Sequence, residues 1–166
     1  MPNGEESIDG IALDGFGAAV SVSELLGTRC RQVPTDAGIY LVTYEGEERP
    51  EFLEVGTGGR FRDLDPNHPI EVLDANWVDG GRVVYVGKAA GEEGLYQRIR
   101  QLVRFGNGKR AAHRGGRALW QIAGAHALEV RWRTCAAAVA ADQESEAIAA
   151  FADGHDGRRP FANMRD

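Results

Sequence analysis

Arg98 is the residue whose type and position most clearly suggest chemistry. It lies in the stretch Arg82–Arg104, RVVYVGKAAGEEGLYQRIRQLVR. The apolar residues in the second half of this stretch recur at helical spacing, at Leu95, Ile99, Leu102 and Val103. Arg98 lies at the edge of that stripe, whereas Arg100 and Arg104 point away from it. A guanidinium in this place offers phosphate a planar, permanent charge, although an arginine whose stem only packs along a sheet would occupy the same place.

The elements around Arg98 must position it beside other polar groups. Residues 38–44 and 83–86 are dense in β-branched and aromatic residues and predict two strands. Because side chains alternate along a strand, Tyr40 shares one face with Val42 and Tyr44.

The second half of the chain predicts two further helices and a strand. A helix is expected around Trp120, and residues 128–133 alternate as a half-buried strand. A last helix is expected over about residues 142–152, with Asp142 as its N-cap and Phe151 facing inward. This order predicts an α+β fold, in which a small central, mainly antiparallel three-stranded sheet is flanked by helices.

Two segments lie outside this pattern. Residues 1–33 form a lead-in; its first 20 residues, rich in glycine, alanine and acid, predict little order, and a short helix follows at 21–26. Residues 45–81 form an acidic insertion that we expect to pack on the sheet edge, with possible strands at 52–55 and 71–78. The length of 166 residues suits one domain.

Charge is segregated along the chain, although the net charge is only −6. Residues 1–81 hold 5 Lys and Arg against 16 Asp and Glu, residues 82–133 hold 11 against 3, and residues 134–166 hold 3 against 6. A local positive face attracts a phosphate backbone, so the acidic total does not exclude DNA. The alternative is that these arginines form only the solvated faces of two helices.

Other residues give weaker signals. Cys30 and Cys135 show no metal-ligand spacing and are expected to be reduced thiols. His68 has the pattern of a loop residue, since no cysteine or second histidine lies at ligand spacing. No segment has the length and apolarity of a signal peptide or a membrane span, so we expect a soluble, cytoplasmic protein without a membrane partner.

Five elements, taken in order, resemble the GIY-YIG nuclease superfamily: Gly38-Ile39-Tyr40, Tyr85-Val86-Gly87, Arg98, a glutamate in a later helix, and Asn163. The similarity covers residues 38–44 and 82–163. The family usually joins its two tyrosine strands by a short hairpin, and here residues 41–84 intervene. An insertion at a hairpin tip costs little closure entropy, so it leaves the sheet assignment intact.

The resemblance also indicates which glutamate matters. Family members place a metal-binding acid four residues before an isoleucine in a helix that ends near a proline and an asparagine. Glu144 has this spacing from Ile148 and lies one turn below it, on the core side. Glu146 is rotated toward solvent, so Glu144 is the predicted ligand.

By resemblance, the chain is expected to be a metal-dependent DNA endonuclease that uses one Mg²⁺ or Mn²⁺ ion held by Glu144. Arg98 would bind the scissile phosphate. Tyr40 is the candidate base, with a lowered phenol pKa, and Tyr85 would orient water or phosphate. Asn163 would hold the tyrosines by hydrogen bonds.

Further residues are candidates for contacts with the substrate: Gly87, Lys88, Arg104, His113, Arg114 and Arg117. Gly87 permits a close backbone approach, and the cations would give affinity without sequence choice. His113 could contact phosphate or be a solvated loop residue. Double-strand cleavage would need a homodimer, a partner protein or repeated nicking.

Two alternatives stay open at this point. A non-catalytic nucleic-acid-binding module could keep the same fold and basic face, and it would show salt-sensitive DNA binding without a metal-dependent product. An RNA nuclease would differ only in its substrate, and no residue pattern separates it from a DNA enzyme. The target sequence and the biological role are not written in the sequence.

Overall fold

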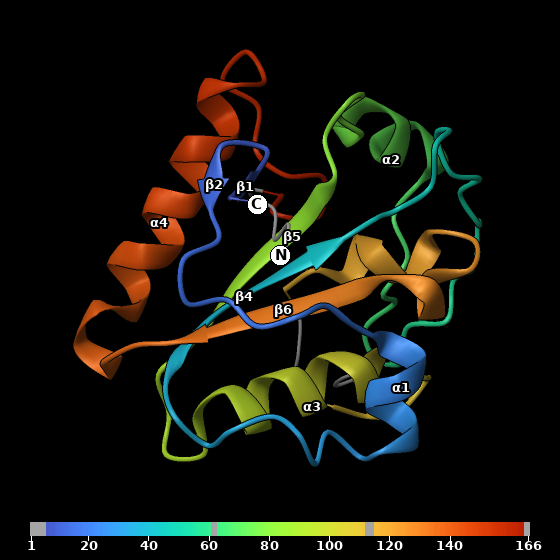
Figure 1. Ribbon diagram of the computed structural model, residues 1–166. Coiled ribbons are helices and arrows are strands. Elements are labelled where there is room, and N and C mark those ends of the chain that lie inside the picture. The colour runs from blue at the N-terminus through green and yellow to red at the C-terminus, as the bar shows by residue number, and fades with distance from the viewer. Residues whose placement is uncertain (1–5, 61–62, 112–114, 165–166) are drawn as a thin grey trace.

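A computed structural model describes residues 6–60, 63–111 and 115–164, and these form an α+β fold around an antiparallel sheet (Figure 1). The strand order is β3 (Val20–Ser21), β6 (Glu129–Thr134), β4 (Gly38–Thr43) and β5 (Val83–Ala89). Among the described residues, no helix is long and apolar enough to cross a membrane.

The central strand β4 confirms the first predicted strand. All six of its residues are buried, and it pairs with both β5 and β6. Its register places Tyr40 opposite Gly87 and Val42 opposite Tyr85. The two tyrosines therefore lie on one face of the sheet, offset by one diagonal step.

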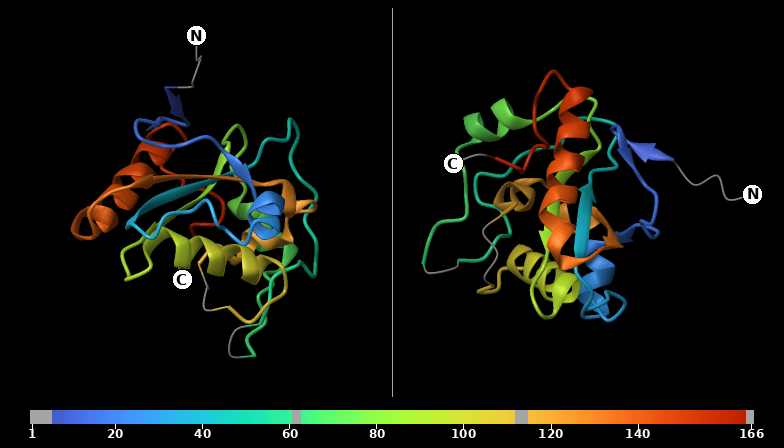
Figure 2. Two further views of the ribbon diagram at one scale, coloured as in Figure 1. Left: turned by 60° about the horizontal axis from the view of Figure 1, so that its bottom comes forward. Right: turned by 90° about the vertical axis from the view of Figure 1, so that its left-hand side faces the viewer.

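Helices cover the two faces of the sheet, as Figures 1 and 2 show. On the Tyr40 face, the apolar stripe of α3 (Gly94–Gly106) packs against the sheet beside α1 (Val22–Gly27). On the other face, Phe151 of α4 (Ala137–Asp153) packs against Leu41 and Val86. The alternation of side chains along β4 and β5 thus supplies both cores.

The predicted helix around Arg98 is confirmed as α3. Leu95, Ile99 and Leu102 are fully buried, and the exposed Arg100 and Arg104 lie on the opposite side. The loop before β4 caps the helix, because the main-chain oxygen of Asp36 accepts the N–H of Leu95 at 2.9 Å.

The lead-in is more ordered than predicted. Residues 7–12 form a hairpin of β1 (Ser7–Ile8) and β2 (Ile11–Ala12), whose isoleucines pack into the Phe151 core. The side chain of Asp9 accepts the N–H groups of Arg82 and Val83 at 2.7 and 2.6 Å. The two isoleucines and the Asp9 side chain thus hold this glycine-rich segment against the rest of the fold. The sheet has four strands rather than the predicted three, because β3 pairs with β6.

The insertion contains a helix where a strand was expected, so the prediction for residues 71–78 is wrong. Residues 70–76 form α2 (Ile70–Asn76), and its buried Leu73 lies one turn before the buried Trp77. This short apolar pattern fits both periods, and the contact of Trp77 with Phe161, 5.2 Å between ring centroids, favours the helix. Phe52 forms only an isolated bridge with Ile122, in place of the strand expected at 52–55.

Two late elements also differ from expectation. The helix expected around Trp120 is a pair of 3₁₀ helices, η1 (Arg117–Gln121) and η2 (Ala125–Ala127), each preceded by a glycine with positive φ. The last helix begins at Ala137, and its N-cap is Ala136 rather than Asp142. The alanines before Asp142 favour helix strongly enough to extend it by a turn.

Candidate functional site

The two motif tyrosines lie on adjacent strands and contact each other. Their ring centroids are 6.1 Å apart with an interplanar angle of 50°, and a hydrogen bond joins their hydroxyls. Tyr40 is fully buried, and Tyr85 is 8% exposed. The strand pairing of β4 with β5 therefore brings together residues that are far apart in the sequence.

Gly87 is required by the packing of Tyr40. It lies opposite Tyr40 in the ladder, and the phenol ring covers it so closely that a Cβ at this position would collide with the ring. The close approach that Gly87 permits is thus made by Tyr40, which fixes the height of the ring above the sheet.

Arg98 reaches the tyrosines from α3. Its side chain is partly buried, and its Nη1 donates to Oε1 of Gln101, one turn later, at 2.9 Å. This bond orients the guanidinium beside Tyr40 and Tyr85. Its positive charge acts to lower the pKa of both phenols.

Glu144 reaches the same place from α4. It is partly buried, whereas Glu146 on the same helix is exposed. A cavity of about 340 Å³ is lined by residues from β4, β5, α3, α4 and the turn after β5. Its lining is Tyr40, Tyr85, Lys88, Ala90, Arg98 and Glu144. The structure therefore brings four of the five predicted catalytic residues to one cavity and places Glu146 outside it.

Burial dominates the electrostatics of the site. It raises the pKa of the Glu144 carboxyl above its ordinary value, and the charges of Lys88, Arg159 and Arg98 act in the opposite direction. Burial likewise raises the pKa of Tyr85, and it raises the pKa of Tyr40 well above its ordinary range. Without a metal ion both phenols are protonated at neutral pH. The lowered tyrosine pKa expected from the sequence is therefore not a property of the chain alone.

One carboxylate is available for a metal ion. Among the described residues, no group of three or more His, Cys, Asp or Glu side chains could hold one. The cavity contains Glu144 and room for water molecules. This donor set fits Mg²⁺, which usually keeps several of its waters and takes one or two carboxylates from the protein.

Asn163 forms hydrogen bonds with the main chain of β5 next to Tyr85. Its Oδ1 accepts the N–H of Val86 at 2.8 Å, and its Nδ2 donates to the carbonyl of Val86 at 2.9 Å. The N–H of Ala162 also donates to the carbonyl of Val84 at 2.8 Å. These bonds hold the main chain on both sides of Tyr85 at the edge of β5. The hydrogen bonds expected of Asn163 are thus made to the main chain next to Tyr85.

The other predicted contact residues are divided. Lys88 lines the cavity of Glu144, and Arg117 lines a neighbouring one. Arg104 lines a separate cavity beside α1, formed with Leu25 and Leu26, and lies outside the candidate site. His113 and Arg114 lie outside the described residues.

Two residues near the site were missed by the sequence reasoning. Gln101 orients Arg98, and its signal is the spacing of three residues on one helix. Arg159 acts on the pKa of Glu144 and donates from Nε to the main-chain oxygen of Asn163 at 2.8 Å. Its signal is a spacing of four residues before Asn163, which is visible only once Asn163 has been singled out.

A carboxylate, a guanidinium, an ammonium and two phenols around one cavity can bind a phosphodiester and position a metal ion against it. Searches against family models, curated proteins and solved structures return no match to this chain.

Proposed function

We propose that this protein is a metal-dependent endonuclease that hydrolyses DNA phosphodiester bonds, with a one-metal site of the GIY-YIG type. The observation that carries the proposal is the convergence of Arg98 and Glu144 on one cavity bordered by Tyr40 and Tyr85. These residues come from two strands and two helices on opposite faces of the sheet. A packing role for each residue does not require that they meet.

Arg98 is the proposed phosphate-binding residue. Its guanidinium, held by Gln101, would bind two non-bridging oxygens of the scissile phosphate. Lys88 lies at the exposed rim of the same cavity and would neutralise further negative charge. Both cations would stabilise charge that builds on the phosphoryl oxygens during attack.

Glu144 is the residue that would hold Mg²⁺ or Mn²⁺. When bound, such an ion supplies a hard cation that polarises the phosphate and stabilises the leaving 3′-oxygen. Burial raises the pKa of Glu144. A cation in the cavity would lower that pKa and favour the charged form of the carboxyl.

Tyr40 is the proposed base. In its phenolate form, left once the phenol proton has passed to solvent, its Oη would take a proton from the attacking water, the new phosphorus–oxygen bond would form, and the bond to the 3′-oxygen would break. The products are a 5′-phosphate and a 3′-hydroxyl, the latter protonated by solvent. The positive charge of Arg98 favours the phenolate that this step needs, and the hydrogen-bonded Tyr85 would orient the water.

The test is the relaxation of supercoiled plasmid by the full chain, with Mg²⁺ or Mn²⁺ against EDTA, and with structured RNA as a second substrate. The proposal predicts nicked circles with metal and no product with EDTA. Salt-sensitive DNA binding with no metal-dependent product from any substrate would contradict it and would support the non-catalytic binding module. Cleavage of RNA alone would keep the site and change the substrate.

A further inference from the structure

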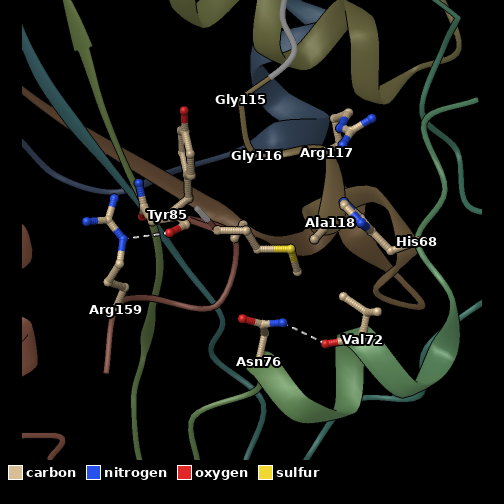
Figure 3. A pocket seen from close by; sticks show the side chains of 12 residues that line it. His68, Val72, Asn76, Tyr85, Gly115, Gly116, Arg117, Ala118 and Arg159 are labelled. Atoms are coloured by element: carbon tan, nitrogen blue, oxygen red, sulfur yellow. Dashed lines mark hydrogen bonds between the residues drawn. The ribbon is translucent and has the colours of Figure 1, made fainter. Parts of the chain in front are cut away.

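A second cavity, of about 580 Å³, lies next to the proposed active site, and Tyr85 lines both. Figure 3 shows Tyr85 and Arg159 on one side of it, with Arg117, Ala118 and His68 on the opposite side and Val72 and Asn76 of α2 along the third. A ligand in this cavity would therefore lie beside any group bound at Arg98 and Glu144.

The insertion between the two tyrosine strands builds one wall of this cavity, through His68, Val72 and Asn76. That wall is fixed by the buried Gln121. Oε1 of Gln121 accepts the N–H of His68 at 2.7 Å, and Nε2 donates to the carbonyl of His68 at 2.9 Å. Gln121 is 1% exposed, so its bonds are shielded from water. The part of this wall at His68 is therefore preformed.

The lining combines groups that suit an aromatic anion. Val72, Ala118 and Ala162 supply apolar surface, and Tyr85 supplies an aromatic ring. Arg117 and Arg159 supply two positive charges. The bond from Nε of Arg159 to the main-chain oxygen of Asn163 holds that guanidinium beside Tyr85. Flat rings stack on aromatic and guanidinium groups, and phosphates pair with the latter.

The size of the cavity further limits which ligands could bind there. Small-molecule sites typically measure roughly 300–1,000 Å³, and about 580 Å³ accommodates one nucleotide. A stacked duplex does not fit. A base could enter only from a single strand or after leaving the stack, as in enzymes that extrude a nucleotide from a duplex.

We propose that this cavity is a recognition pocket for one unstacked nucleotide of the substrate strand, next to the phosphodiester held by Arg98 and Glu144. The inference rests on the proposed nuclease function. It assigns to the insertion the choice of substrate, because its residues contact the base and not the scissile phosphate.

Mononucleotide binding tests the pocket without cleavage. The full chain carrying Glu144→Gln is titrated in EDTA with each of the four deoxynucleoside 5′-monophosphates and with 2-deoxyribose 5-phosphate. Isothermal titration calorimetry measures each affinity. We expect at least one nucleotide to bind about tenfold or more tightly than the sugar phosphate, because the base stacks in the pocket. Equal affinities, or no binding of any nucleotide, would overturn the proposal.

Two variants locate the bound nucleotide. Val72→Trp fills the pocket from a helix position that is 36% exposed, and Val139→Trp places the same side chain on α4 at a position 39% exposed and outside the lining. We expect Val72→Trp to weaken nucleotide binding about tenfold and Val139→Trp to leave it unchanged. Arg117→Gln serves as a second pocket variant, with the same expected direction. Unchanged binding in both pocket variants would overturn the assignment.

The two proposals fail in different ways. A chain that binds nucleotides at Val72 but never cuts a nucleic acid would keep the pocket and overturn the nuclease. A chain that nicks DNA with metal, and does so equally well with Val72→Trp and without any preference for a base, would keep the nuclease and overturn the pocket.

Discussion

Glu144 is a carboxyl that the fold places where its charged form is disfavoured. Burial raises its folded pKa above the ordinary value of 4.5. The neutral carboxyl therefore stabilises the folded chain fully below that ordinary value, and this contribution is lost as the pH rises through the folded pKa. The charges of Lys88, Arg159 and Arg98 offset only part of this effect of burial, and the proposed metal ion would favour the charged carboxyl further.

The raised pKa of Glu144 predicts that Glu144→Gln changes the stability of the fold. The amide is neutral at every pH, so in EDTA near pH 7 the variant should melt at a higher temperature than the wild type. The gain should vanish near about pH 4, where the wild-type carboxyl is also neutral. Thermal unfolding at both pH values measures it, with the exposed Glu146→Gln as the matched control. The same gain at both pH values would contradict the assigned cause.

The proposed role of Arg98 predicts how a substitution there changes the rate of plasmid nicking. Arg98→Lys keeps the charge but loses the planar fork and the bond to Gln101, so plasmid nicking should fall roughly 100-fold. Arg100→Lys makes the same exchange on the exposed side of α3 and should nick like the wild type. Equal nicking rates of the two variants would contradict the proposed role of the Arg98 guanidinium. They would show either that a positive charge alone suffices at position 98 or that cleavage does not depend on this side chain.

At the scale of elements, the pairing of β4 with β5 sets the position of Tyr40. A Cβ at Gly87 would collide with the phenol ring, so Gly87→Ala should lower the free energy of unfolding by about 1–3 kcal/mol and reduce nicking. Gly91→Ala is the control, because its Cβ would meet only Oε1 of Gln97 at 3.6 Å, an ordinary contact. Denaturant unfolding of both variants measures the difference. A tolerated Gly87→Ala would mean that Tyr40 moves without consequence.

Elements with a strong period were predictable from the sequence. The stripe of α3 extends over Leu95, Ile99 and Leu102, and β4 is an unbroken run of strand formers. The two-residue strand β3 and the short helix α2 have no comparable pattern. β3 forms because it pairs with β6, and α2 is favoured by the contact of Trp77 with Phe161.

The site was predictable to a similar degree. The grouping of Tyr40, Tyr85, Arg98 and Glu144 was expected from the resemblance of their motifs, whereas alternation and helical spacing predict only the face of its own element that each residue occupies. The contacts of Arg159 and the wall at His68 depend on the path of two irregular segments. Local pattern carries no information about such a path.

In the whole molecule, the two cavities are lined by residues from segments of opposite net charge. The proposed site draws Arg98 and Lys88 from the basic stretch 82–133, and the second cavity adds Val72 from the acidic insertion. The basic stretch would thus supply the attraction to a phosphate backbone and, through Arg117, part of the base pocket, whereas the acidic insertion would supply only contacts with the base.

The salt dependence of DNA binding tests this division. Lys88→Ala and Arg117→Ala should each reduce the slope of log affinity against log salt by about 0.9, if each side chain contacts one phosphate. Arg104→Ala should leave the slope unchanged, because Arg104 lines the separate cavity beside α1. Fluorescence anisotropy in EDTA over a range of salt concentrations measures the slopes. An equal change in all three variants would indicate a diffuse basic surface.

Under the proposed function, Glu144 completes one metal-dependent site with Tyr40, Tyr85 and Arg98. The most direct measurement is the rate of plasmid nicking in Mg²⁺ by Glu144→Gln beside Glu146→Gln, two equal exchanges within one turn of α4. We predict a loss of roughly 100-fold or more for Glu144→Gln and a rate close to the wild type for Glu146→Gln. A Glu144→Gln variant that nicks as fast as the wild type would contradict the account.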